Sequence, residues 1–169
     1  MSNIGSSKIG EMYVGSTKIA EAYLGSTLVF QLPATGYDYY MVHLTWNSND
    51  NFNMAGLHVN GVQPEQYQVA WLKYYNGGWS AASSSDMETA IQWNNNDNGK
   101  SFYCSAIDIK LTFFPDKPSS VQIKTGTWYG GGSMKVTMHV AGVNDGVETD
   151  LGYTQKTNGA NTIYTVNPR

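Results

Sequence analysis

Residues Ile107-Asp-Ile-Lys-Leu-Thr-Phe113 alternate apolar and polar side chains without a break. Successive side chains of an extended strand point to opposite faces, so a period of two predicts a half-buried β-strand. An amphipathic helix would instead need apolar residues three and four positions apart. The alternation therefore predicts a strand with a polar outer face and with four residues in the core: Ile107, Ile109, Leu111 and Phe113.

Similar segments flank this strand on both sides, and turn-forming residues bound them. They cover residues 39–46, 56–60, 68–73, 120–124, 134–140, 148–153 and 162–166. Residues 76–100 form a long irregular stretch that is too polar for a core, and loops of this length are often functional. About eight short strands with frequent turn signals predict an all-β fold, a β-sandwich or jelly roll with little helix.

A ten-residue phrase is written three times before these strands, with copies that begin at Ile4, Val14 and Leu24. The first four places of each copy hold an aliphatic residue, a glycine and two hydroxyl residues, which predict one tight turn beside one short strand. Both faces of these strands are largely apolar, and about thirty residues cannot bury two such faces alone. We therefore expect copies of the same chain to cover them in a symmetric oligomer, a homotrimer. The residues expected at this interface are Ile9, Tyr13, Val14, Ile19, Tyr23, Leu24 and Val29.

The alternative is a plain hairpin that packs against the following domain. Residues Leu32-Pro-Ala-Thr-Gly36 end the repeat with a proline and a glycine, which mark a domain boundary. The chain is thus predicted to consist of a short β-repeat stalk or anchor, residues 1–33, followed by a β-sandwich, residues 34–169.

The stretch from Tyr13 to Val29, Tyr-Val-Gly-Ser-Thr-Lys-Ile-Ala-Glu-Ala-Tyr-Leu-Gly-Ser-Thr-Leu-Val, resembles a repeat found in fibre and appendage proteins of tailed bacteriophages. That repeat commonly precedes a receptor- or glycan-binding domain. The resemblance implies a virion structural protein that contacts other virion proteins. The third copy departs from the pattern at Leu28 and Gln31, as the end of a repeat array would require.

The composition argues against several classes of protein. Charged residues make up 14% of the chain and the net charge is −3, which does not fit the basic surface of a nucleic-acid-binding protein. The single cysteine, Cys104, forms neither an internal disulfide nor a zinc knuckle. The N-terminus has no apolar signal region and no segment approaches the ~18 apolar residues of a membrane span. We expect synthesis in the host cytoplasm without a signal peptide or membrane insertion, and localisation in the virion.

A second resemblance, to the discoidin or F5/8-type galactose-binding-like jelly roll, covers parts of the C-terminal region. It rests on Ala55-Gly-Leu-His-Val59, on Asp86-Met-Glu-Thr-Ala-Ile-Gln-Trp93, and on Ile107 to Phe114 with Ser120-Val-Gln-Ile123. A loop of that family often helps to hold a structural calcium ion, and the resemblance carries this role to Asp86 and Thr89 alone. Met87 and Glu88 stand where the family has Gly-Asn. Apart from that ion, we expect no cofactor.

No catalytic residue emerges from the spacing of the side chains. His43, His58 and His139 each occupy an alternating strand position without a second ligand at motif spacing, which is typical of half-exposed sheet histidines rather than zinc ligands. Residues Ser83-Ser-Ser85 lack the Gly-x-Ser-x-Gly turn of a nucleophilic serine. We therefore expect a protein that is not an enzyme.

Tryptophans flank the predicted loops, and asparagines lie close to them in the sequence. Aromatic rings contact the C–H faces of sugars, while a few placed polar groups bind the hydroxyls. The sequence therefore predicts a ligand site formed by Trp46, Asn47, Asn49, Trp79, Trp93, Asn94 and Asn95. The alternative for each tryptophan is a place in the core.

These features predict a noncatalytic bacteriophage structural protein, in a head or tail fibre or appendage, whose β-sandwich binds a bacterial surface glycan. One alternative is a freestanding carbohydrate-binding module or an accessory domain of a glycan-active system. Another is a capsid decoration protein without a ligand. The oligomeric mass in solution discriminates between a stalked and a freestanding protein.

Overall fold

The computed structural model describes residues 37–47, 51–93, 99–114, 116–127 and 133–169. It describes helical residues 84–87 and six short strands between residues 3 and 31 by their backbone alone. The later elements are β7 Tyr39–Trp46, β8 Phe52–Val59, the 3-10 helix η1 Gln66–Gln68, β9 Val69–Tyr75, β10 Gly78–Ala81, α1 Ser84–Ile91, β11 Lys100–Phe102, β12 Ala106–Leu111, β13 Val121–Thr125, β14 Lys135–Asn144, β15 Val147–Thr157 and β16 Ile163–Val166.

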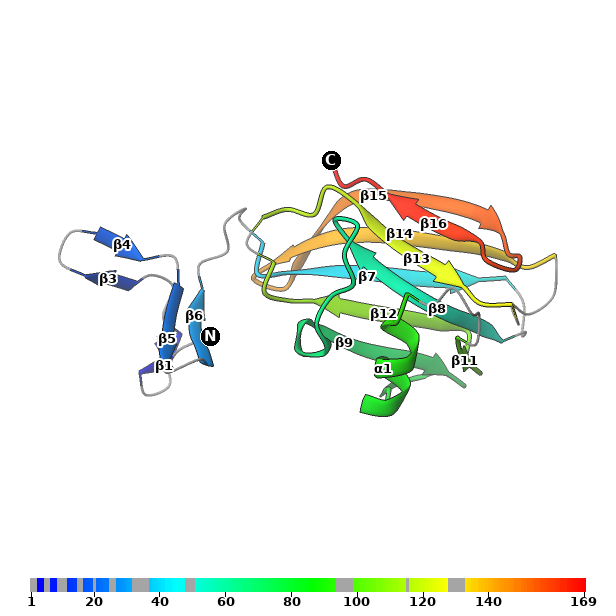
Figure 1. The fold of residues 1–169 in the computed structure, drawn as a ribbon, viewed down its shortest axis with the longest axis horizontal. Coiled ribbons are helices and arrows are strands. Elements are labelled where there is room, and N and C mark those ends of the chain that lie inside the picture. Colours follow the sequence, from blue (N-terminus) through cyan, green and yellow to red (C-terminus); the bar gives the residue numbers. More distant parts are fainter. Residues whose placement is uncertain are drawn as a thin grey trace.

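These strands form two antiparallel sheets that pack face to face (Figure 1). The larger sheet has six strands in the order β10-β9-β12-β7-β14-β15, and the smaller has four in the order β11-β8-β13-β16. The predicted all-β class and the β-sandwich are therefore confirmed. Every pairing in both sheets is antiparallel.

The core lies between the sheets and is filled by the inward residues of each alternating strand. Ile107, Ile109 and Leu111 are fully buried, as their alternation predicted. Two aromatic contacts join the sheets: the ring centroids of Trp46 and Phe52 lie 5.2 Å apart, and those of Trp71 and Phe102 lie 5.3 Å apart.

The prediction that Phe113 belongs to the core is wrong. Strand β12 ends at Leu111, and Phe113 is 42% exposed with a φ of 62°. The backbone N–H of Thr112 still donates to the carbonyl of Gln68, one pair beyond Leu111 and Val69, so the bonding to the β9 side ends only after Thr112. The positive φ then turns the side chain of Phe113 away from the core and toward the ring of Tyr67, 6.1 Å away.

Two-residue turns with Asn-Gly or Asp-Gly sequences shape three of the strand connections. Asn76 and Gly77 join β9 to β10, and both have a positive φ, 49° and 84°. Residues 60–61 and 145–146 repeat this pattern of positive φ. Such turns match the twist of antiparallel strands and need residues that tolerate the left-handed region, which explains the Asn-Gly and Asp-Gly pairs.

The expectation of an irregular stretch over residues 76–100 needs correction. It contains β10, α1 and the beginning of β11. Helix α1 has eight residues and packs against β8 through its buried Ala90 and Ile91. Such a short helix shows too few turns for its periodicity to stand out in the sequence.

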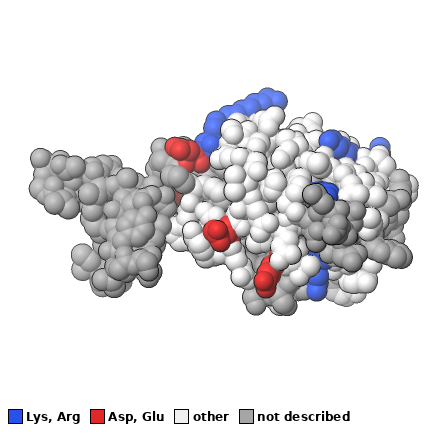
Figure 2. Space-filling model, in the orientation of Figure 1, with Lys and Arg blue, Asp and Glu red and all other residues white. Residues whose placement is uncertain are grey.

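Within the described residues, no helix is long and apolar enough to cross a membrane. On the face shown in Figure 2, the basic and acidic side chains of the described residues are few and scattered.

The repeat region forms three two-stranded hairpins: β1 Asn3–Ile4 with β2 Ser7–Lys8, β3 Met12–Val14 with β4 Thr17–Ile19, and β5 Glu21–Leu24 with β6 Thr27–Gln31. Their pairing recurs with the period of the repeat, because Ile4 pairs with Ser7, Val14 with Thr17, and Leu24 with Thr27. The side chains of Tyr13, Val14, Ile19, Tyr23, Leu24 and Val29, and all of Ile9, lie outside the described residues. The trimer interface stays a prediction.

Candidate functional site

The candidate site is the outer face of the six-stranded sheet. On this face every second side chain of each strand points away from the core, where a ligand can reach it. Helix α1 packs mainly against β8 of the other sheet, so it leaves this face accessible. The strand register arranges the outward side chains in rows that run across the sheet. One row reads Trp79, Tyr74, Ala106, Thr45, Thr137 and Gln155, and the next reads Ala81, Leu72, Asp108, His43, His139 and Tyr153.

An aromatic pair, of which the Trp79 ring is exposed and the Tyr74 ring half-buried, lies at one end of the first row. Trp79 on β10 is 48% exposed, and its ring centroid lies 5.1 Å from that of Tyr74 on β9. Ser105 holds this hairpin to the sheet, since its backbone N–H and its hydroxyl both donate to the carbonyl of Tyr74, at 2.9 and 3.2 Å. The two rings are tilted by 55° to each other, and the Trp79 ring presents an apolar face to solvent.

A cluster of histidines and carboxylates lies in the centre of the second row. The ring of His43 stacks on that of His139 with the centroids 5.6 Å apart. His43 Nδ1 lies 2.7 Å from Asp108 Oδ1, and His43 Nε2 lies 3.3 Å from Glu148 Oε2. His139 Nε2 lies 2.9 Å from Asp150 Oδ1.

These contacts shift two protonation equilibria. The hydrogen bond with Asp108 raises the pKa of His43, although burial acts in the opposite direction, and Glu148 adds to the rise. The hydrogen bond from His139, together with that from the Gly152 backbone, lowers the pKa of Asp150. The cluster therefore favours an imidazolium at His43 and a carboxylate at Asp150.

The predicted tryptophans lie in three different environments. Trp46 is 8% exposed and stacks on Phe52 in the core, so its assignment to a ligand site is wrong. Trp93 stacks on His58 at 3.8 Å between centroids, against the smaller sheet. A Cβ atom on Gly56 would come within 2.7 Å of the Trp93 ring, so the glycine makes room for it. Among the three, only Trp79 lies on the outer face of the larger sheet.

Asn47 is the predicted asparagine that lies within the described residues. The side-chain oxygen of Asn47 accepts from the backbone N–H of Lys135 at 2.8 Å, which ties the end of β7 to the beginning of β14. Asn49, Asn94 and Asn95 lie outside the described residues.

The loop that the calcium prediction assumed is absent, since Asp86 and Thr89 lie on helix α1. Within the described part of the chain, no three His, Cys, Asp or Glu side chains are placed to hold a metal ion. Burial raises the pKa of the Cys104 thiol to about 11, so the thiol is protonated at neutral pH.

Sequence reasoning missed the His43–His139 cluster and Tyr153. The only signal in the sequence was the outward position of each residue in its own strand. This signal was not sufficient, because polar residues at outward positions are common and do not reveal which strands are neighbours.

Comparison with known protein families finds no match to this chain. Searches of curated proteins and of solved structures likewise find no significant match.

Proposed function

We propose that this protein is a noncatalytic carbohydrate-binding β-sandwich that attaches to a glycan through the outer face of its six-stranded sheet. The observation that carries the proposal is the exposed Trp79 ring, which lies beside the half-buried Tyr74 ring on this accessible face. A large apolar ring that remains in water on a rigid strand offers a surface to the C–H face of a sugar.

Polar groups near the pair supply what a sugar needs besides a flat apolar surface. Thr45 and Thr137 follow in the same row, and the carboxylates and imidazoles of the next row offer acceptors and donors. Small-ligand sites usually combine aromatic rings with a small number of precisely placed polar groups.

The N-terminal repeat supports a role in a virion. We propose that its hairpins form a stalk that clusters several β-sandwiches on a tailed bacteriophage, where avidity compensates for weak binding by each copy. This part of the proposal rests on the resemblance of residues 13–29 to repeats of phage fibres and appendages. A monomer in solution would favour the freestanding carbohydrate-binding module instead.

A glycan array probed with the full-length protein tests the binding function. Trp79→Ala should weaken binding about tenfold or more, as truncation of an aromatic anchor does. Tyr67→Ala is the matched control, because Tyr67 is 70% exposed but lies before the opposite end of β9. Equal binding by wild type and Trp79→Ala, or no binding by wild type to an array or to bacterial cells, would contradict the proposal.

A further inference from the structure

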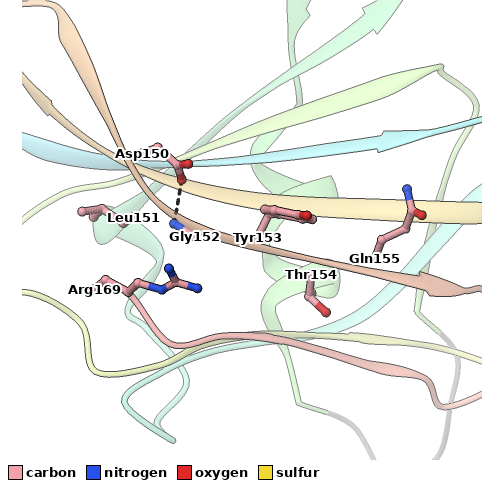
Figure 3. Close-up of a pocket in the computed structure, with 7 residues that line it drawn as sticks. All are labelled: Asp150, Leu151, Gly152, Tyr153, Thr154, Gln155 and Arg169. Carbon is pink, nitrogen blue, oxygen red and sulfur yellow. Dashed lines mark hydrogen bonds between the residues drawn. The ribbon is translucent and has the colours of Figure 1, made fainter.

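A pocket of about 550 Å³ lies along the edge strand β15, at the other end of the same sheet (Figure 3). Its volume is within the range of small-ligand sites, roughly 300 to 1,000 Å³. The pocket is lined by Asp150, Leu151, Gly152, Tyr153, Thr154, Gln155 and Arg169. Tyr153 is 71% exposed, so its ring is accessible to a ligand.

A β-bulge places three of these side chains on the outer face. Val140 of β14 pairs with Gly152, and Ala141 pairs with Asp150, so Leu151 has no partner in the ladder. The extra residue shifts the alternation, and Gly152 accommodates it with a φ of 131°. As a result Leu151 is buried, while Asp150, Tyr153 and Gln155 face outward.

Two acceptor oxygens flank the Tyr153 ring in fixed orientations. Asp150 Oδ1 accepts from His139 Nε2 at 2.9 Å and from the Gly152 N–H at 2.7 Å, and within the described residues Oδ2 has no hydrogen-bond partner. Gln155 Nε2 donates to the Thr137 hydroxyl at 2.9 Å, which leaves its Oε1 without a partner there. Because both side chains are already ordered, binding to them costs little conformational entropy.

We propose that Tyr153, Asp150 and Gln155 form a second sugar subsite, and that the ligand is a neutral oligosaccharide reaching from this subsite to the Trp79–Tyr74 pair. The proposal rests on the proposed function and names its ligand class. Free acceptor oxygens on either side of a ring require a ligand that donates hydrogen bonds around an apolar face, which describes a pyranose.

The charges on this face disfavour an acidic sugar. Asp108 and Glu148 pair with His43, and Asp150 pairs with His139, so neither imidazole is left to bind a carboxylate-bearing ligand. The charge of Arg169, which also lines the pocket, acts on Asp150. Lys110 points its ammonium group over the Tyr39 ring, 3.8 Å from the centroid.

The two subsites are too far apart for one sugar ring. Five strand spacings separate β10 from β15, or about 24 Å at ~4.8 Å each. The row between Trp79 and Gln155 contains the small side chains of Ala106, Thr45 and Thr137, which leave space for a chain of sugars. Linked contacts at both ends raise the affinity for a long ligand above that for a short one.

Titration calorimetry on the full-length protein, with neutral oligosaccharides of graded length taken from the array hit, tests this inference. Wild-type affinity should rise with length until both subsites are filled. Tyr153→Ala and Gln155→Ala should each weaken binding of the longest ligand by about tenfold, and should leave the shortest ligand unchanged. Tyr153→Phe keeps the ring and should bind like wild type, and all three variants should keep the wild-type melting temperature because these side chains are exposed.

The outcomes separate the two proposals. If wild type binds and Trp79→Ala does not, but Tyr153→Ala and Gln155→Ala bind every length like wild type, the second subsite is wrong and the proposed function stands. A preference for carboxylate-bearing sugars on the array overturns the ligand class. If the wild-type protein binds no glycan, the proposed function and the further inference are both wrong.

Discussion

Replacing Leu111 by alanine should destabilise the β-sandwich far more than replacing Phe113, although both continue the same alternation. Leu111 is fully buried and pairs with Tyr40 on one side and Val69 on the other. Removing most of a buried leucine side chain leaves a cavity and costs about 2–5 kcal/mol. A domain of this size is stable by roughly 5–15 kcal/mol, so the loss is a large share of the total.

Phe113 is the matched control two residues away. It is 42% exposed and its main aromatic neighbour is Tyr67, so truncation should cost about 1 kcal/mol or less. Its positive φ is equally unfavourable for phenylalanine and alanine, so the backbone adds no difference.

Urea denaturation followed by tryptophan fluorescence measures both effects. With a slope of about 2 kcal/mol per molar urea, the middle of the range for small proteins, Leu111→Ala should lower the midpoint by roughly 1–2.5 M. Phe113→Ala should lower it by much less. Equal losses, or a larger loss at Phe113, would show that β12 continues into the core beyond Leu111 and would refute the reasoning.

The folded-state pKa of His43 is raised above 6.5 by Asp108, so this contact stabilises the protein fully below pH 6.5 and the stabilisation is lost as pH rises through the folded pKa. Asp108→Asn should therefore cost more unfolding free energy at pH 6 than at pH 8.5 in urea titrations, and an equal cost at both values would contradict this. Trp93→Ala should lower the melting temperature by several degrees, because the Trp93 ring covers Gly56 and stacks on His58. Trp79→Ala should leave the melting temperature nearly unchanged. If calorimetric scans show the opposite order, the assignment of the two rings is reversed. Light scattering should find a trimer for the full-length protein. Ile19→Asp should weaken the trimer, because an unpaired charge in an apolar interface loses its hydration. A monomeric wild-type protein would contradict the prediction of an oligomeric stalk.

Alternation within single strands was sufficient to predict the fold class and much of the core. Residues 39–46 and 107–111 alternate in the sequence, and their inward side chains are buried. This pattern is a local property of the extended backbone, because every second side chain faces the same way wherever the strand lies. The Asn76-Gly77 turn is local in the same sense, since only residues that tolerate a positive φ permit it.

The burial of individual aromatic residues depended on tertiary structure. Trp46, Trp79 and Trp93 all stand near loops in the sequence, yet one packs in the core, one is exposed on the larger sheet and one covers the smaller sheet. Phe113 continues a clean alternation but leaves the strand because its φ of 62° turns the chain just after Thr112, which still bonds in register to Gln68.

The candidate site depended on tertiary structure to the greatest degree. His43 and Asp108 are 65 residues apart, and they meet only because β7 and β12 are neighbours in one register. A shift of one residue in either strand would turn one of the two side chains into the core. The β-bulge at Leu151 likewise decides that Tyr153 and Asp150 share a face. Strand order and register follow from the packing of two whole sheets against each other, and no short stretch of sequence contains that information.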